Sequence, residues 1–373
     1  MTGEPNAEIM NFEHWDDDLK PLSEIAAWVK QAAKETGFEL AGIAPVAEFP
    51  ELNRFSEWIA AGHAGEMQYL EKLGPDGNLK RASLHSAVPW ARSVIVCAIN
   101  YNTAQPYSTE AHASDRGWIS RYAWSQEDYH DAVLRRLRVV EDRLRSITDK
   151  TPALQTLCYV DTGPVVERVY AKYAGVGWIG KNTCILNQQM GSWLFLGVII
   201  TSLELTPDLP APDRCGSCTR CIDGCPTDAL IAPYQLDSNR CISYLTIEKR
   251  GEIPEEMREG MGRHIFGCDI CQDVCPWNRK APASDAQEFQ PREGLVNPAL
   301  EWLAEMTAEE FREKFRGSPV RRTKRSGLRR NAVIAMGNSG NRQFTPVLEK
   351  LAADEDPLVA EHAKWAVRKL SAS

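Results

Sequence analysis

Eleven cysteines stand in this chain of 373 residues, and four of them have the spacing of iron–sulfur ligands. Cys215, Cys218, Cys221 and Cys225 form a C-x2-C-x2-C-x3-C run that a proline follows. Two-residue gaps let one tight loop aim three thiolates at three irons of a cubane, whereas the cysteine beside proline lies too far round to join them. In two-cluster proteins that fourth cysteine ligates the other cluster. The run therefore predicts two [4Fe–4S] clusters.

A second cysteine run supplies the remaining ligands. Its spacing is C-x2-C-x3-C before Pro276, so it lacks a first cysteine, and Cys241 is the available replacement. We assign one cluster to Cys215, Cys218, Cys221 and Cys275, and the second to Cys225, Cys241, Cys268 and Cys271. Two zinc ions in all-cysteine tetrahedral sites are the alternative, but the interleaved pattern is atypical of zinc.

Three cysteines remain outside both runs. Cys97, Cys158 and Cys184 each lie in or beside an apolar stretch. A free cysteine in such surroundings behaves as a small hydrophobic residue. We expect all three to be buried structural thiols.

The segment GVGWIGK, from Gly175 to Lys181, satisfies G-x-G-x-x-G and the first part of a P-loop. It follows the helical stretch VVERVYAKYA instead of a strand, and Asn182 stands where a P-loop has the Ser or Thr that binds magnesium. These differences exclude NAD and ATP sites. A glycine-rich turn can still bring backbone amides and Lys181 close to a large polar cofactor.

Asp161 lies in YVDTGPVVERV, where the predicted strand LQTLCYV meets a predicted helix with Pro164 in its first turn. One interpretation is a helix N-cap. The other is a catalytic acid, because strand ends carry catalytic groups in α/β folds and apolar neighbours raise the pKa of a carboxyl toward neutrality. Position alone favours the cap.

Composition is that of a globular protein, with 43% hydrophobic and 25% charged residues, and no apolar run is long enough to cross a bilayer. The acidic N-terminus has neither an apolar stretch nor a twin-arginine pair, so we expect a cytoplasmic chain without a membrane partner. Thiols stay reduced in the cytoplasm, so closely spaced cysteines are expected to bind metal instead of forming disulfides.

The chain divides by pattern into segments. From Pro21 to about Leu205, helical stretches alternate with β-rich runs such as SVIVCAIN and SWLFLGVII, which predicts an α/β layer fold. Short turns rich in Pro, Asp, Gly and Cys follow Pro207. Beyond Gln290 the chain is helical and resembles HEAT-type helix pairs, although fewer than two repeats fit. This end is either a helical cap or a binding arm.

The net charge of −8 disfavours nucleic acid as a partner, but the charge is unevenly distributed. The stretch from Arg312 to Arg330, which we call the basic window, contains nine basic residues and a single acidic residue, Glu313. A solvated charged face is the usual role of such a run. A polyanion site is the alternative, because concentrated positive charge binds a phosphate backbone.

Five motifs together closely resemble the epoxyqueuosine reductase family, the cobalamin-dependent iron–sulfur enzymes of tRNA modification. They cover most of residues 20–290, and the helical C-terminal stretch also fits the family. The motifs are RYAWSQEDYH (Arg121 to His130), VDTGPVVER (Val160 to Arg168), GVGWIGKNT (Gly175 to Thr183), CGSCTRCIDGCPTDAL (Cys215 to Leu230), and the pair CISYLTIE and CDICQDVCPWN (Cys241 to Glu248, Cys268 to Asn278).

The resemblance implies a fold of mixed α+β and α/β character with three parts after an N-terminal extension at residues 1–20. These are an α/β cobalamin-binding catalytic domain (21–205), a ferredoxin-like two-cluster domain (206–290) and a helical HEAT-like tRNA-binding region (291–373). It also implies reduction of epoxyqueuosine to queuosine at the wobble position of a tRNA anticodon. Electrons from an external donor such as a flavodoxin or ferredoxin would pass through the clusters to cobalamin.

The resemblance also assigns residues. Asp161 becomes the proton donor to the epoxide oxygen, in place of a cap. The expected corrin-pocket residues are Arg81, Tyr122, Asp161, Lys181, Ile185, Ser243 and Asp269. From the charge pattern, and not from the resemblance, we expect contacts to the tRNA anticodon arm at Arg250, Arg321, Arg322, Lys324 and Arg325. The D-x-H-x-x-G motif of proteins that ligate cobalt through histidine is absent from the sequence.

Two other functions fit parts of the sequence. A corrinoid reductive dehalogenase also joins cobalamin to two clusters, but the missing twin-arginine signal and the basic window disfavour it. The second is a ferredoxin-type electron-transfer protein without a substrate of its own, whose N-terminal domain only docks a partner. A bound corrinoid would exclude that function.

Overall fold

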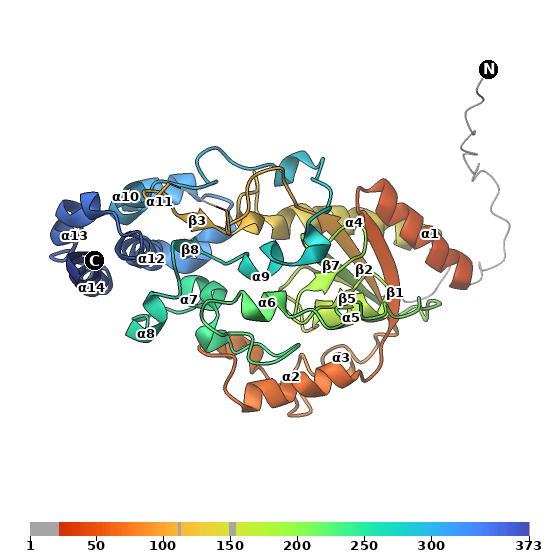
Figure 1. Cartoon of the computed structure of the whole chain (residues 1–373). Coiled ribbons are helices and arrows are strands. Elements are labelled where there is room, and N and C mark those ends of the chain that lie inside the picture. Colours follow the sequence, from red (N-terminus) through yellow and green to blue (C-terminus); the bar gives the residue numbers. More distant parts are fainter. Residues whose placement is uncertain (1–21, 111–112, 149–153, 373) are drawn as a thin grey trace, which may run out of the picture.

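A computed structural model describes residues 22–110, 113–148 and 154–372, so the predicted extension at residues 1–20 lies outside the described residues. A sheet with its helices forms one end of the molecule, helices from the C-terminal part form the other end, and the cysteine-rich segment lies between them (Figure 1). None of the helices in the described ranges is long and apolar enough to cross a membrane.

The elements fall into three groups along the chain. Those before the cysteine-rich segment are α1 (Leu22–Glu35), β1 (Leu40–Pro45), α2 (Pro50–Ala60), η1 (Gln68–Leu70), α3 (Leu84–Ala87), β2 (Ser93–Asn100), β3 (Trp118–Ile119), η2 (Arg121–Ala123), α4 (Tyr129–Ile147), β4 (Thr156–Tyr159), α5 (Glu167–Tyr173), β5 (Trp178–Ile179), β6 (Ile185–Leu186) and β7 (Leu194–Thr201). Within that segment are α6 (Arg220–Asp223), η3 (Ser238–Arg240), α7 (Ile242–Ile247), α8 (Glu255–Arg258), β8 (His264–Phe266), α9 (Ile270–Asp273) and η4 (Pro276–Asn278). After it come η5 (Gln287–Phe289), α10 (Leu300–Glu305), α11 (Ala308–Lys314), η6 (Pro319–Thr323), α12 (Lys324–Asn338), η7 (Arg342–Phe344), α13 (Thr345–Leu351) and α14 (Pro357–Ala372).

The main sheet has the order β1-β2-β7-β4, and every neighbouring pair is antiparallel. Along β2, Ile95 and Ile99 pack toward α1 and α4, whereas Val94 and Val96 pack toward α5 on the opposite face. Burial of both faces explains why SVIVCAIN is apolar at nearly every position. The predicted strands and layers are confirmed. The antiparallel pairing makes this part α+β in topology.

One glycine lets α4 lie directly on the sheet. A Cβ atom at Gly197 in β7 would stand 2.6 Å from Leu137 and 3.0 Å from Val133, both on α4. Any larger residue would therefore push the helix away. This matters for function because α4 begins at Tyr129 and presents His130 in its first turn.

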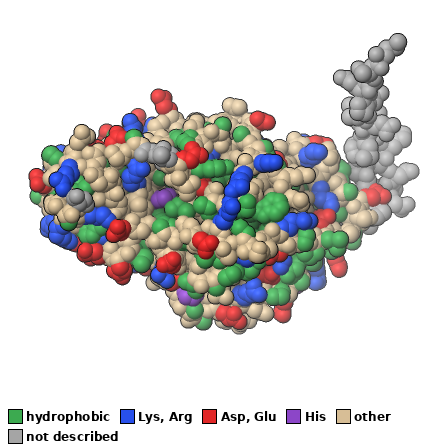
Figure 2. Space-filling model, viewed as in Figure 1, with side chains coloured by type: hydrophobic (Ala, Val, Ile, Leu, Met, Phe, Trp, Pro, Cys, Tyr) green, Lys and Arg blue, Asp and Glu red, His purple; other side chains and the backbone are tan. Residues whose placement is uncertain are grey.

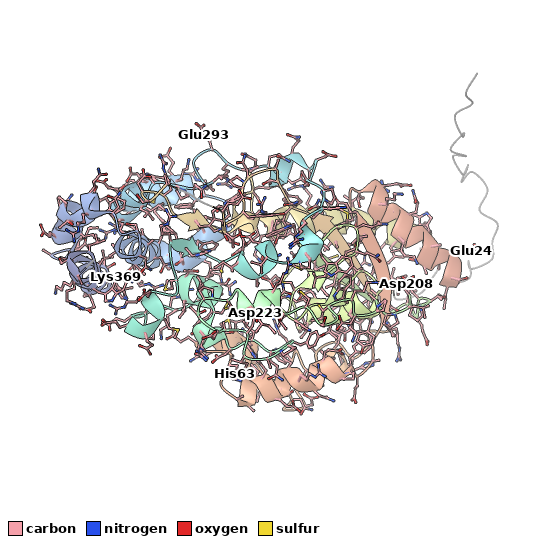
Figure 3. All side chains as sticks on the ribbon, viewed as in Figure 1. Glu24, His63, Asp208, Asp223, Glu293 and Lys369 are labelled. Atoms are coloured by element: carbon pink, nitrogen blue, oxygen red, sulfur yellow. The ribbon has the colours of Figure 1, made fainter. Side chains whose placement is uncertain are left out.

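The start of the cysteine-rich segment is tied to the sheet by Asp208, labelled in Figure 3. Its carboxylate accepts hydrogen bonds from Lys30 Nζ of α1 at 2.7 Å and from the backbone N–H of Ile43 in β1 at 2.9 Å. The segment therefore leaves the sheet from a fixed point.

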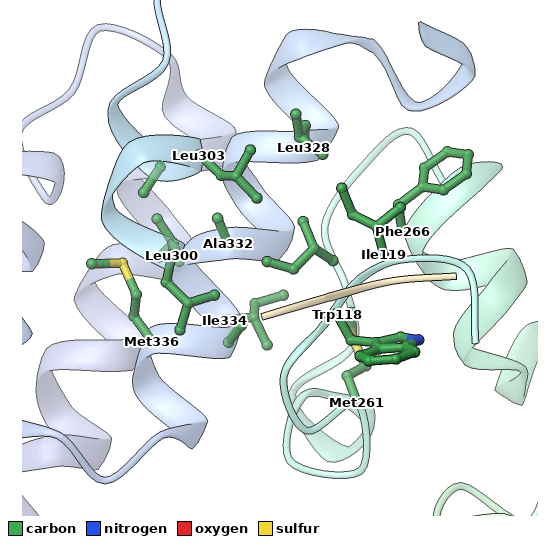
Figure 4. Packing of buried hydrophobic residues seen from close by; sticks show 14 of the residues in the cluster. Trp118, Ile119, Met261, Phe266, Leu300, Leu303, Leu328, Ala332, Ile334 and Met336 are labelled. Atoms are coloured by element: carbon green, nitrogen blue, oxygen red, sulfur yellow. The ribbon is translucent and has the colours of Figure 1, made fainter. Parts of the chain in front are cut away.

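The C-terminal helices share one hydrophobic core with the middle of the chain. Trp118 and Ile119 of β3 and Phe266 of β8 pack with Leu300 of α10 and Ala332 of α12, as Figure 4 shows. This core crosses the boundary predicted at residues 290 and 291. The C-terminal end is thus a helical cap packed on the body. Its HEAT-like repeat character and the domain boundaries stay predictions.

Helix α12 corrects part of the basic window. Arg330 is fully buried, and its guanidinium donates hydrogen bonds to the backbone carbonyls of Leu245, Lys249 and Gly251. Arg329 is also buried and binds the carboxylate of Asp354. The expectation that these two arginines contribute to a surface charge is wrong, because their donors satisfy polar groups inside the protein.

We predict that Arg330→Gln lowers the free energy of unfolding by on the order of 3 kcal/mol, because it leaves buried carbonyl oxygens without donors. Urea denaturation measures this change. Arg321→Gln is the matched control, since Arg321 is exposed and its loss should change stability by about 0.5 kcal/mol or less. Equal stability of both variants would contradict the structural role of Arg330.

Candidate functional site

Two cavities lie beside the cysteine-rich segment. The larger has a volume of about 1100 Å3, which exceeds the roughly 300–1,000 Å3 typical of small-molecule sites. Its walls come from the sheet, from α2 and the loop after it, from α5, and from the segment around α7. The smaller cavity lies between the loop after β5 and the turns around α6 and η4.

The cavities divide the eight candidate ligands into two sets. Cys215, Cys218, Cys221 and Cys275 line the smaller cavity. Cys225, Cys241, Cys268 and Cys271 line the larger one. Among the described residues, no three His, Cys, Asp or Glu side chains are grouped as ligands of one metal ion. The four thiolates of a cubane each bind a different iron, so they surround a volume instead of converging on one point.

The thiol electrostatics follow the same division. Burial raises the pKa of Cys275 to about 11, and the thiols of Cys221 and Cys215 add to the effect. Burial also raises the pKa of Cys268 well above its ordinary value, and the thiols of Cys241 and Cys225 add to the effect. Cys275 therefore neighbours cysteines of the first run, although it belongs to the second run in sequence.

Contact between α6 and α9 brings Cys275 of the second run beside the cysteines of the first run. The two short helices follow the first cysteines of their runs and pack against each other. A Cβ atom at Gly224 would stand 3.4 Å from Val274 and 2.9 Å from the Arg220 carbonyl oxygen. Glycine at this position thus fits closely against the end of α6, and Val274 of the second run lies in ordinary van der Waals contact with it.

The other three cysteines differ from one another. Cys97 is fully buried in β2, as expected. Cys158 is half-buried and donates a hydrogen bond to Glu141. Cys184 is half-buried in the wall of the larger cavity, where it is hydrogen-bonded to Cys271. The prediction of a buried thiol is confirmed for Cys97, whereas Cys158 and Cys184 are only partly buried and each has a polar contact.

Asp161 is not a helix cap, because α5 begins only at Glu167 and is capped by Val166. Asp161 lies in the left-handed region with φ of 60° and is 60% exposed at the larger cavity. Tyr129 Oη donates a hydrogen bond to its carboxylate at 3.1 Å, and Arg81 donates one to its backbone carbonyl at 3.4 Å. Asp161 Oδ2 lies 3.8 Å from His130 Nε2.

The pKa of Asp161 is lowered, which is the opposite of the prediction. His130 lowers the pKa of Asp161 to about 2, and Arg168 and the Tyr129 hydroxyl add to the effect. Burial alone would lower the pKa of His130, but its contacts with Asp128, at 2.7 Å, and with Asp161 outweigh burial and raise it to about 9. The prediction of a raised carboxyl pKa was wrong, because the interaction of Asp161 with His130 outweighs the effect of burial, which alone would raise it.

Five of the seven residues predicted for the corrin pocket line the larger cavity, namely Arg81, Tyr122, Asp161, Ile185 and Ser243. Lys181 lies instead at the smaller cavity, where its Nζ donates to the carbonyls of Gly216 and Cys218. Asp269 is fully buried behind the wall and accepts hydrogen bonds from Trp118, Ser120 and Arg121.

The sequence reasoning missed other residues of the cavity. His130 lies inside the motif RYAWSQEDYH, yet no role was assigned to it. Glu167 and Trp178 also line the larger cavity. Each has a buried polar atom without a hydrogen-bond partner, Oε1 in Glu167 and Nε1 in Trp178. Burial raises the pKa of Glu167 to about 7, with Asp161 as a second cause. Glu167 and Trp178 both lie inside motifs that carry the resemblance, VDTGPVVER and GVGWIGKNT, and that membership is the one signal in the sequence that could have identified them.

The residues predicted for tRNA binding have different environments. Arg322 lines the cavity mouth and pairs with Glu248 at 2.6 Å. Arg250 and Arg325 each donate to backbone carbonyls, whereas Arg321 and Lys324 are exposed. Acidic and basic side chains are interspersed over the face seen in Figure 2. The basic window is therefore only partly available to a polyanion.

Two sets of four cysteines, one of them facing a large cavity with an Asp–His pair, define an iron–sulfur oxidoreductase of the two-cluster type. Residues 214–278 match the model of a 4Fe-4S double cluster binding domain. Residues 81–162 match the model of epoxyqueuosine reductase QueG, DUF1730.

Relatives extend this similarity to most of the chain. An epoxyqueuosine reductase of Synechocystis is 43% identical over 297 residues, which are 78% of this chain and 98% of the relative. One of Xanthomonas campestris is 38% identical over 92% of this chain and 96% of its own. A crystal structure of an epoxyqueuosine reductase with a tRNA-Tyr epoxyqueuosine-modified stem loop matches with a TM-score of 0.84 and 31% identity, covering 94% of this chain and 91% of that one. The chain therefore belongs to the epoxyqueuosine reductase family.

We predict that His130 keeps its proton at neutral pH and loses it near pH 9. Asp161→Asn should lower the pKa of His130, because one of the two carboxylates facing the imidazole becomes neutral. NMR titration of ring-labelled histidine measures both values, and His130→Gln identifies the signal. A His130 pKa near 6.5 in the unchanged chain would contradict the ion pair.

Proposed function

We propose that the chain reduces epoxyqueuosine to queuosine at the wobble position of a tRNA anticodon. The observation that carries the proposal is the large cavity, since it joins one set of four cysteines to the pair of Asp161 and His130. Electrons and a proton can thus reach one substrate within the same cavity. The reaction consumes two electrons and two protons and converts the epoxide to an alkene and water.

We assign the cluster ligands in the crossed pattern. One [4Fe–4S] cluster takes Cys215, Cys218, Cys221 and Cys275, and the other takes Cys225, Cys241, Cys268 and Cys271. The two cavities support this division, as does the pKa of Cys275, which responds to thiols of the first run. An external donor of the flavodoxin or ferredoxin class would reduce the outer cluster first.

The larger cavity fits a corrinoid. Its size exceeds that of ordinary ligand sites, and two buried polar atoms, on Glu167 and Trp178, lack partners within the protein. Arg81, Tyr122, Ile185 and Ser243 would hold the ring from the surrounding walls. Its two histidines, His63 and His130, already face aspartates, which agrees with binding without a histidine ligand. When bound, cobalamin supplies a low-potential cobalt that reduces the carbon–oxygen bond.

His130 and Asp161 together would deliver a proton to the epoxide oxygen. With a pKa of about 2, Asp161 holds no proton at neutral pH, whereas His130, with a pKa of about 9, does. Asp161 would therefore pass the proton of His130 to the epoxide oxygen as negative charge develops there. Asp128 holds the imidazole in place at 2.7 Å.

The tRNA backbone would bind across the helical cap. Arg321 and Lys324 are the exposed cations nearest in sequence to Arg322 at the cavity mouth. Phosphate contacts there would position the anticodon arm, while the modified base enters the cavity in a flipped-out state. We retain the boundaries 21–205, 206–290 and 291–373 for the three parts.

We predict about eight irons and eight sulfides per chain, and that Cys275→Ser damages the cluster anchored by Cys215. The reason is that Cys275 lies in the smaller cavity with the first run. EPR of the reduced protein, with iron and sulfide analysis, distinguishes the two clusters. Cys97→Ser is the control and should keep both. A loss confined to the cluster of Cys268 and Cys271 would refute the crossed assignment.

We predict that Asp161→Asn and His130→Gln each lower the rate of epoxide reduction on the order of a hundredfold while clusters and corrinoid remain bound. In the unchanged enzyme, activity should fall as pH rises through about 9, because His130 then loses its proton. His130→Gln should remove this alkaline decline. Glu127→Gln, a nearby carboxylate paired with Arg135, is the control. Normal turnover by Asp161→Asn would rule out the proton path.

A further inference from the structure

An aromatic side chain and an arginine meet at the mouth of the larger cavity. The guanidinium carbon of Arg322 lies 5.3 Å from the centroid of the Tyr69 ring. Of the large hydrophobic side chains that are exposed among the described residues, Tyr69 is the one aromatic, at 39% exposure. Both residues line the cavity that contains Asp161. A flat, solvent-accessible surface thus borders the entrance to the proposed reaction centre.

The backbone that carries Tyr69 is fixed to the cysteine-rich segment. The loop after α2 passes His63, labelled in Figure 3, whose imidazole lies 3.5 Å from Asp237. The backbone N–H of Glu66 donates to Tyr244 Oη at 2.7 Å, and its carboxylate binds Lys249. Gly65, with φ of 60°, allows this approach because a Cβ atom there would overlap the Tyr244 ring. Tyr69 is therefore held in position before any partner binds.

The charge of Arg322 is already compensated. Its Nε lies 2.6 Å from Glu248 Oε1, and the Glu248 side chain is only 16% exposed. Arg321 and Lys324, by contrast, have no ion-pair partner among the described residues. Phosphate binding through released counterions requires uncompensated cations. Arg322 is thus better suited to stacking than to phosphate binding, whereas Arg321 and Lys324 suit phosphate.

Stacking is what a base-flipping enzyme needs at this place. Moving the wobble base into the cavity leaves the neighbouring base without one of its stacking partners. Aromatic rings and arginine planes bind such unstacked bases in single-stranded RNA, with about 1–3 kcal/mol per base. A surface that stands beside the cavity entrance can replace the lost contact.

We propose that Tyr69 and Arg322 form a platform on which the nucleobase next to the wobble base stacks while the wobble base occupies the cavity. The proposal rests on the proposed function, which it deepens by naming a contact to the RNA. It also separates two roles within the basic window: Arg322 contacts a base, and Arg321 and Lys324 contact phosphates.

The first test measures the affinity of the holoenzyme for an anticodon stem–loop RNA at several salt concentrations. Tyr69→Ala should weaken binding about tenfold or more, and Tyr69→Phe should bind like the unchanged enzyme. Arg322→Gln combined with Glu248→Gln should weaken binding without reducing the salt slope, because the pair carries no net charge and the loss of Glu248 also frees Arg250. Arg321→Ala should instead reduce the slope of log affinity against log salt by about one.

The second test pairs Tyr69→Ala with RNA that lacks one base. Abasic nucleotides replace, in turn, the residue on either side of the wobble position. If the platform stacks a base, one abasic RNA should bind unchanged enzyme about as weakly as Tyr69→Ala binds intact RNA, and the two changes together should cost little more. Additive losses for both abasic RNAs would overturn the proposal, as would a reduced salt slope for the Arg322 and Glu248 double variant.

The outcomes separate this proposal from the proposed function. An unchanged enzyme that binds no stem–loop, or does not reduce its epoxide, would overturn the proposed function itself. Normal reduction with full affinity after Tyr69→Ala would overturn the platform alone. Iron, sulfide and corrinoid contents of each variant show that the site is intact.

Discussion

The contact between α6 and α9 is the constraint on which the site depends. In the crossed assignment that we propose, eight thiolates surround two volumes, and each set of four draws on both cysteine runs. Because the two short helices pack against each other, Cys275 lines the smaller cavity with the first run, while Cys225 lines the larger one. The elements around them are too short to hold this arrangement alone, so it relies on the sheet and the helical cap.

The cap and the sheet stabilise that segment by different means. On one side, Asp208 ties its start to α1 and β1 through two hydrogen bonds. On the other, buried Arg330 satisfies carbonyl groups in the last turn of α7 and just after it, where the helix supplies no internal donors. An irregular chain is thus fixed by polar contacts at its edges and by a shared hydrophobic core.

The sequence predicted the two-cluster motif and the buried strands because both depend on short-range spacing, whereas the assignment of Cys241 and Cys275 to their sets depends on the folded chain and stays a prediction. The run from Cys215 to Cys225 and the apolar stretch of β2 each carry their own signal. The ionisation of Asp161 could not be predicted, since it depends on His130, which lies on a different element and meets it only in the folded chain. The burial of Arg329 and Arg330 could not be predicted for the same reason, because a run of positive charge does not show which of its side chains lie inside the protein.

The core that α12 shares with β3 and β8 also bears on how long the clusters survive. A cubane in a protein is lost when oxygen or a chelator reaches it, and this requires the surrounding chain to open. With the cap and the cysteine-rich segment packed as one body, such openings need a large part of the molecule to separate at once, so they should be rare. The C-terminal helices would then protect the clusters kinetically, although they supply none of the eight thiolates.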